Sequence, residues 1–138
     1  MNLLVTNTHA PQAYAVVRAL RPHAARIVAT VEGTGPRASV AAHAARSRLV
    51  DRRCPVPSPA ADWAAGRISR ENTPAEARYV EALERICREE HIDAIYPSWD
   101  PHVYVLAKNR ERFAAQGVVV PVPDLDVVLT ALDKHLTV

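Results

Sequence analysis

The chain has 138 residues, of which 49% are hydrophobic and 23% are charged, as is typical of one globular domain. Its 17 Lys and Arg residues against 15 Asp and Glu residues leave a net charge of +2, too mild to indicate a nucleic-acid or anionic-membrane partner. Cys54 and Cys87 match no metal-binding spacing and imply no disulfide framework, so we expect a reducing, cytoplasmic location. No apolar run approaches the roughly 20 residues of a membrane span.

The first segment of the chain has the pattern of a strand, a loop, a helix and a second strand. Residues 3–5 form a short apolar run, which predicts a strand buried on both faces. After a polar loop, Pro11 opens a helix that we expect to end near Arg21, because Pro22 follows. Residues 26–31 predict the second strand.

The next segment gives weaker signals. After a Gly- and Pro-punctuated loop, the alanine-rich residues 38–46 predict a short helix, and residues 49–50 a short third strand. The proline-dense residues 54–59 fit only a sheet edge or a loop, because proline cannot donate to a central ladder. Residues 60–72 are polar and predict a loop or a frayed helix.

A strong start signal for a long helix follows. Thr73 is a good N-cap, Pro74 suits the first helical position, and Glu76 completes a capping box. Apolar residues recur on one face from Ala77 onward, and we expect the helix to end near His91.

The last segment repeats the alternation. Residues 92–96 predict a strand, and Asp100 before Pro101 predicts the N-cap of a helix that stops at Gly117. Residues 118–120 predict a further strand, and residues 124–132 a last helix. Strands alternating with helices form βαβ units, so the predicted fold class is α/β, a three-layer, doubly wound, mainly parallel sheet of about five strands.

Ligands of such folds bind at the carboxyl ends of the strands, so the loops at 6–10, 32–36 and 97–101 are the candidate site. The first loop contains no glycine, which argues against a dinucleotide cofactor. Asn7, Thr8 and the following helix N-terminus could bind an anion or form a plain polar connection. We interpret Glu32, where a ribose-binding acid would stand, as a solvated loop residue.

The most polar cluster after a strand is Ser98, Trp99, Asp100 and His102. Asp100 could act only as an N-cap, and His102 lies in a first helical turn, where a neutral imidazole is plausible. His9 could approach His102 if the first and fourth predicted strands are adjacent, but no local spacing supports a metal site.

Several segments, in this order, resemble the N-terminal domain of ATP-grasp ligases related to the carbamoyl-phosphate synthase large subunit. The similar segments are MNLLVTNTHAPQAYAVVRAL, ARSRLVDRRCPVPSP, YVEALERICREEHIDAIYPS, VYVLAKNRERFAAQGVVVPVPD and LTALDKHLTV. Each is weakly specific alone, and their order and spacing carry the resemblance over almost the whole chain. It implies a Rossmann-like "pre-ATP-grasp" domain over residues 1–132, with 133–138 as the start of a missing ATP-grasp domain.

In that family the full enzymes use ATP and Mg²⁺ to make an acyl phosphate, which an amine or another nucleophile attacks. The resemblance implies that Lys134 reaches ATP from the seam between domains and that two loops face a small-molecule acceptor substrate. The candidate substrate-binding residues are Asn7, Thr8, His9, Ser98, Asp100 and His102. Chains of this family often carry acidic residues where this one reads Ser98-Trp99-Asp100, so the acceptor stays open.

We therefore expect an N-terminal ligase domain that is not catalytic by itself, binds no ATP or Mg²⁺ alone, and has the missing ATP-grasp domains as partners. The glycine-rich phosphate loop and the metal-binding carboxylates of that family do not occur in these 138 residues. The alternatives are a free-standing Rossmann-like binding or interaction module, possibly a homodimer, and a small nucleotide-binding enzyme. A tail that folds back to bury Leu136 and Val138 would favour the free-standing module.

Overall fold

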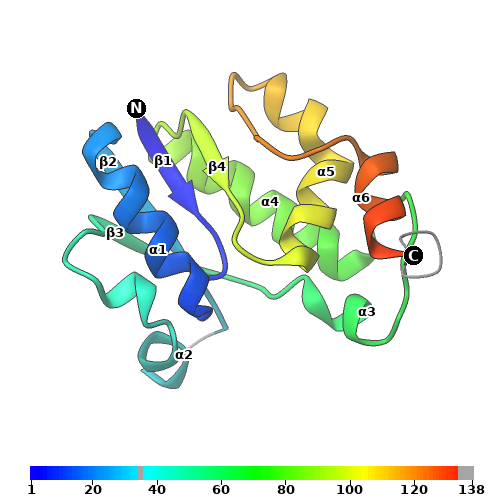
Figure 1. Cartoon of the computed structure of the whole chain (residues 1–138), viewed down its shortest axis with the longest axis horizontal. Helices are drawn as coiled ribbons and strands as arrows, with labels where there is room; N and C mark the ends of the chain where they lie inside the picture. Colours follow the sequence, from blue (N-terminus) through cyan, green and yellow to red (C-terminus); the bar gives the residue numbers. More distant parts are fainter. Residues whose placement is uncertain (34–35, 134–138) are drawn as a thin grey trace.

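Four parallel strands form one sheet in the computed structural model, which describes residues 1–33 and 36–133 (Figure 1). The strands are β1 (Asn2–Val5), β2 (Arg26–Glu32), β3 (Arg52–Val56) and β4 (Ala94–Tyr96). Their order is β3-β2-β1-β4, so the chain steps from β1 to β2 and β3, then returns to the other side of β1. The reversal places the switch in strand order between β1 and β4, and it confirms the predicted doubly wound α/β class.

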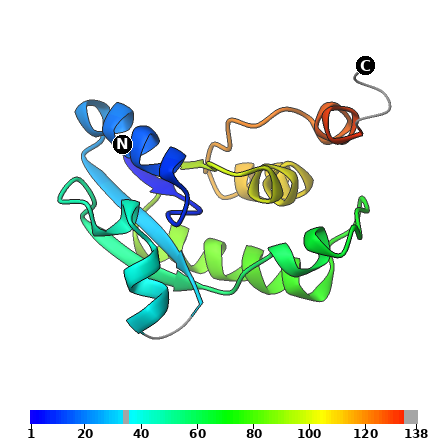
Figure 2. The same cartoon turned by 60° about the horizontal axis from the view of Figure 1, so that its bottom comes forward.

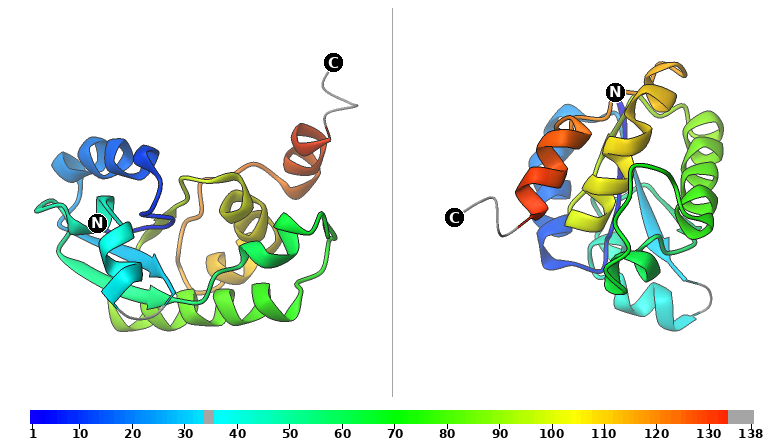
Figure 3. Two further views of the ribbon diagram at one scale, coloured as in Figure 1. Left: turned by 90° about the horizontal axis from the view of Figure 1, so that it is seen from below. Right: turned by 90° about the vertical axis from the view of Figure 1, so that its right-hand side faces the viewer.

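Helices cover both faces of this sheet. They are α1 (Pro11–Leu20), α2 (Pro36–Ala41), α3 (Ala60–Ala64), α4 (Pro74–Glu89), α5 (Asp100–Ala114) and α6 (Leu125–Leu132), with 3₁₀ turns at Arg21–His23 and Ala44–Arg46. Helices α1 and α4 lie on opposite sides of the sheet, and α5 and α6 lie toward its β4 side, far from α2 (Figures 2 and 3). None of the helices in the described ranges is long and apolar enough to cross a membrane.

The strands alternate their side chains between two apolar layers, as a pleated sheet requires. Leu4 and Val28 belong to the larger cluster, which α4 and α5 complete, whereas Val5 and Ile27 pack with α1. All four side chains are fully buried. This double burial explains why the central strands read as continuous apolar runs.

Two strand predictions need correction. The third strand lies at Arg52–Val56 and not at residues 49–50, and it includes Pro55, which is tolerated because β3 is an edge strand. Residues 118–120 form a single parallel bridge, between Val119 and Ala94, and no further strand is seen in the described ranges. The chain at Val119 pairs only briefly with β4, because β4 itself is three residues long.

The N-cap of α4 is formed as the sequence predicts. The Thr73 side-chain oxygen accepts the backbone N–H of Glu76 at 3.2 Å. We expect Thr73→Ala to lower the free energy of unfolding by about 1 kcal/mol, because an orphan helix donor loses its acceptor. Urea unfolding would measure this loss. Thr73→Ser should retain most of the stability, and equal losses in both variants would contradict the cap assignment.

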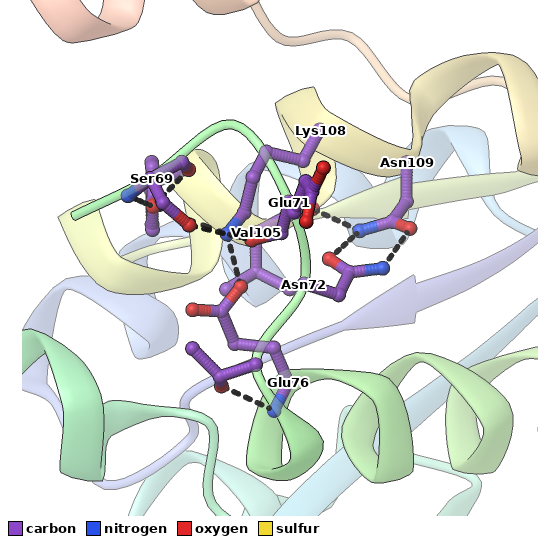
Figure 4. Close-up of polar contacts among 9 residues, drawn as sticks. Ser69, Glu71, Asn72, Glu76, Val105, Lys108 and Asn109 are labelled. Atoms are coloured by element: carbon purple, nitrogen blue, oxygen red, sulfur yellow. Dashed lines mark hydrogen bonds and ion pairs between the residues drawn. The ribbon is translucent and has the colours of Figure 1, made fainter. Parts of the chain in front are cut away.

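A buried ion pair joins α4 to α5, and its cation also binds the segment before α4 (Figure 4). The Lys108 ammonium pairs with the Glu76 carboxylate, and both side chains are only 1% exposed. Lys108 Nζ also donates to the Glu71 carbonyl at 2.9 Å and to the Tyr104 hydroxyl at 3.1 Å. Tyr104 in turn donates to the Ser69 carbonyl at 2.5 Å. One buried cation therefore holds a stretch of backbone that has no regular secondary structure.

A second connection lies beside this pair. The side-chain amides of Asn72 and Asn109 exchange two hydrogen bonds, of 2.8 and 2.9 Å, and Asn109 also donates to the Val105 carbonyl (Figure 4). Because its amide has partners at both ends, the buried Asn109 side chain avoids the cost of an unsatisfied group, while Asn72 remains exposed.

Candidate functional site

The loop after β1 is fixed by its own backbone and by the loop after β4. Asn7 has a φ of 52°, a left-handed conformation that asparagine adopts more readily than most residues. The Ser98 hydroxyl donates to the Thr6 carbonyl at 2.9 Å and to the Asn7 carbonyl at 3.3 Å. The chain therefore turns from β1 into α1 without a glycine, and the two loops at the switch point are joined.

A pocket of about 470 Å³ lies at this carboxyl edge of the sheet. Its lining residues come from the loop after β1, the start of α1, the end of β2 and the loop after β4. They are Asn7, His9, Ala10, Gln12, Glu32 and Trp99. The pocket therefore lies where the strand order reverses, which is the expected position of a ligand site in an open α/β sheet.

The Glu32 carboxylate contacts the His102 ring beneath the pocket. Oε1 of Glu32 lies 2.5 Å from Nε2 of His102, whose side chain is fully buried, whereas the Glu32 side chain is 13% exposed. Burial raises the pKa of the Glu32 carboxyl, but hydrogen bonding to His102 and the charge of His102 outweigh burial, so this pKa lies below its usual value. The interpretation of Glu32 as a solvated loop residue was therefore wrong.

The other ring nitrogen of His102 also has partners. Nδ1 lies 2.9 Å from the Thr6 hydroxyl and 3.2 Å from the Tyr79 hydroxyl. Burial raises the pKa of Tyr79, and the nearby Glu32 charge raises it further, so the phenol stays protonated. Both ring nitrogens of His102 therefore have polar partners, and the buried ring positions the Glu32 carboxylate.

His9 contacts Glu32 as well, at its backbone and not at its carboxylate. The Glu32 N–H donates to His9 Nε2 at 3.1 Å, which assigns the proton of a neutral His9 ring to Nδ1. Strands β1 and β4 are adjacent, which was the condition for His9 to approach His102, but the two residues are linked through Glu32 of β2. In the described part of the chain, no group of three or more His, Cys, Asp or Glu residues is placed to hold a metal ion.

The remaining candidate residues are separated by the structure. Thr8 is fully buried and donates to the Thr30 carbonyl at 2.5 Å, so its hydroxyl ties the loop to β2. Asp100 is exposed and lines a different depression, next to α6. Lys134 and the tail at 134–138 lie outside the described residues.

The prediction that Asp100 caps α5 was wrong. Trp99 is the N-cap, with extended backbone, and its carbonyl accepts the N–H groups of His102 and Val103, both at 3.0 Å. No side-chain hydrogen bond caps this end. Asp100 lies instead in the first turn, where a carboxylate still complements the helix dipole.

We expect Glu32→Gln to lower the free energy of unfolding at about pH 7 by about 1 kcal/mol, because a charged acceptor of His102 is lost. A depressed pKa stabilises the folded state above the ordinary glutamate value of 4.5 and loses this effect as pH falls through the folded-state value. The difference between wild type and variant should therefore shrink in urea unfolding curves as pH falls below 4.5. A difference that grows toward acid would contradict this assignment.

The parallel sheet, the order reversal and the polar pocket at the carboxyl edge define a Rossmann-like α/β domain. A model of the PylC-like N-terminal domain matches residues 39–121, from α2 through the bridge after α5. The chain belongs to this family, whose members are pre-ATP-grasp domains of ATP-grasp ligases. No curated protein matches the chain significantly. The match confirms, over these residues, the resemblance to the N-terminal domain of ATP-grasp ligases that the sequence motifs indicated.

Proposed function

We propose that this chain is the substrate-side N-terminal domain of an ATP-grasp ligase with carbamoyl-phosphate synthase-like chemistry, and that it is inactive alone. The observation that carries the proposal is the pocket at the switch point of a chain belonging to the PylC-like N-terminal family. Polar groups from the loop after β1, the start of α1 and the end of β2 converge there, as in a site that orients a small substrate.

In the proposed reaction, ATP converts a carboxylate into an acyl phosphate, and an amine or another nucleophile displaces the phosphate. ATP and Mg²⁺ are proposed cofactors of the whole ligase, held mainly by the ATP-grasp domains as partners, with Lys134 reaching ATP from the seam. The loop of residues 6–10 lacks the glycines that let backbone approach a polyphosphate, which supports this division of roles.

Asn7, His9 and Ser98 are assigned different parts in this proposal. Asn7 and His9 line the pocket and would contact the acceptor, whereas Ser98 holds the loop that presents them. Thr8 and His102 would act behind the surface, since neither side chain is exposed. The proposal also places the domain in the cytoplasm, in keeping with its two unpaired, buried cysteines.

The test is ADP release from ATP with Mg²⁺ and a panel of small carboxylates and amines. The chain alone should give no turnover. The joined protein, in which the chain is fused to ATP-grasp domains, should turn over ATP only when an acceptor is present. In the joined protein, Gln12→Ala should raise KM for the acceptor and leave KM for ATP unchanged. Gln116→Ala, far from the pocket, is the matched control. Turnover by the chain alone would contradict the proposal.

The alternative is a free-standing binding module, in which the pocket lined by Asn7, His9, Gln12 and Glu32 would bind its ligand directly. A joined protein with no acceptor-dependent ATP turnover, together with ligand binding to the chain alone, would favour this alternative.

A further inference from the structure

The charge of the chain is divided unevenly along its length. Residues 1–60 carry eight arginines against two acidic residues, whereas residues 61–138 carry nine basic against thirteen acidic residues. The net charge of +2 therefore conceals a strongly basic part. This part forms β1, α1, β2, α2 and β3, which gather at one end of the molecule, away from α3 and α6 (Figure 1). Such an asymmetry indicates a charged interaction surface.

Three of the eight arginines are engaged in ion pairs within the domain. Arg26 and Arg52 both pair with Glu90, whose side chain is 5% exposed. Arg21 pairs with Asp51 at 2.7 Å, so one of the two acidic residues of this part is already neutralised. These arginines stabilise the domain and are not available to a partner.

The other five arginines are exposed and form no salt bridge in the part of the chain that the structure describes. They are Arg18, Arg37, Arg46, Arg48 and Arg53. The second acidic residue of the basic part, Glu32, contacts His102 beneath the pocket and pairs with none of them. The five guanidinium groups therefore carry charge that no neighbouring carboxylate offsets.

These five side chains belong to one face of the sheet. Arg53 lies on the face opposite to α4, because its neighbour Cys54 packs into the larger core cluster with α4. The face opposite to α4 is covered by α1, α2 and the 3₁₀ turn at Ala44–Arg46, which pack on β1 and β2. These elements, and the short turn that follows them, carry the other four arginines. We call the five residues together the arginine face.

We propose that the arginine face docks an acidic surface of another protein. A planar guanidinium group binds a carboxylate through two parallel hydrogen bonds, so several unpaired arginines on one face fit a partner that presents several carboxylates. None of the five lines the pocket, so the inference goes beyond the proposed function. Because the charges are exposed, docking must weaken as salt screens them.

The arginine face lacks the features with which proteins bind other polyanions. Single-stranded nucleic acid stacks on aromatic rings, but Tyr14 is the one Phe, Tyr or Trp of residues 1–60, and the Arg18 guanidinium already lies 5.9 Å from its ring centroid. A duplex groove takes a helix that makes several contacts, whereas α1 and α2 carry one of the five arginines each. A membrane surface attracts a compact polybasic run or a basic amphipathic helix, and neither occurs here.

The test measures binding of a dye-labelled decaglutamate peptide to the chain by fluorescence anisotropy, with decaglutamine as the uncharged control. We expect decaglutamate to bind at least about tenfold more tightly than decaglutamine at about 20 mM NaCl. Its affinity should fall at least about tenfold by about 300 mM NaCl. Equal affinity for the two peptides would overturn the proposal.

A triple variant removes part of the arginine face. Arg46→Gln/Arg48→Gln/Arg53→Gln should weaken decaglutamate binding at least about tenfold. All three side chains are exposed and form no salt bridge among the described residues, so the variant should keep the thermal midpoint of the wild type. Unchanged affinity in this variant would contradict the docking site.

A matched variant on the other face of the sheet controls for net charge. Arg78→Gln/Arg85→Gln/Arg88→Gln removes three exposed charges from α4, which also form no salt bridge in the described ranges. It should weaken decaglutamate binding by less than about twofold. Equal weakening by the two triple variants would show that only net charge matters, and would refute the arginine face.

An NMR titration of the wild type covers the case in which a variant does not fold. Decaglutamate should cause the largest chemical-shift changes in α1, α2 and residues 44–56, and changes spread evenly over both faces would overturn the proposal. A ten-nucleotide oligothymidylate and vesicles of phosphatidylglycerol and phosphatidylcholine are the competing probes. Tighter binding of either than of decaglutamate at the same salt concentration would replace the acidic protein with a nucleic acid or a membrane as the partner.

Discussion

Lys108→Met should lower the free energy of unfolding by about 3–5 kcal/mol, which is among the largest effects expected in this domain. The substitution removes the ammonium partner of Glu76 and leaves that carboxylate buried without a compensating charge. It also removes the donor to the Glu71 carbonyl and the cation above the Tyr104 ring, whose centroid lies 4.2 Å from Nζ. Urea unfolding at neutral pH would measure the loss.

The double variant Glu76→Gln/Lys108→Met separates the buried charge from packing. It should recover much of the stability that the single variant loses, because no unpaired charge then remains inside. Arg70→Met is the matched surface control, since Arg70 and Asp126 form an ion pair with both side chains more than 60% exposed. It should change stability by less than about 1 kcal/mol. Equal losses at Lys108 and Arg70 would refute the buried pair.

Phe113→Ala should be destabilising by a similar amount, about 3–5 kcal/mol. Its ring is fully buried in the larger core cluster, where α4, α5 and the chain after α5 meet. Truncation removes apolar contacts and leaves a cavity that the surrounding strands and helices can fill only partly. Thermal and urea unfolding should both show the loss.

Val119→Ala is the control for this prediction. Val119 lies in the segment that packs next to Phe113, but its side chain is 60% exposed, and only its backbone pairs with β4. We expect a change within about 0.5 kcal/mol, as at other exposed positions. A large effect at Val119 would mean that the segment contributes through its side chains, contrary to the burial seen here.

The sequence predicts best those elements whose signal is local. The helix at α1 begins at Pro11, as expected, and ends at Leu20, one residue from the prediction. The Thr73 cap is confirmed by its hydrogen bond. In both cases proline and capping chemistry act within a few residues, so no tertiary contact is needed to place the helix.

The candidate site was predictable only in its position. The rule for parallel sheets selects the edge of the sheet where the pocket lies, but Glu32 and His102 are 70 positions apart, and nothing local pairs them. The one available signal was an acid that ends a buried strand. For Asp100 the local signal was misleading. Aspartate is a residue type suited to capping, but Asp100 lies one position inside the helix.

The central position of β1 in the sheet has a consequence for the order in which the domain folds. It pairs with β2 on one side and with β4, about ninety residues later, on the other. Pairings between such distant segments form slowly, because the entropy cost of closing a long loop comes before the strand contacts can stabilise it. During synthesis the N-terminal βαβ unit can assemble early, but Ser98, Trp99 and His102 leave the ribosome late. The pocket is therefore completed only when Trp99 joins the lining residues that the loop after β1 and the end of β2 contribute.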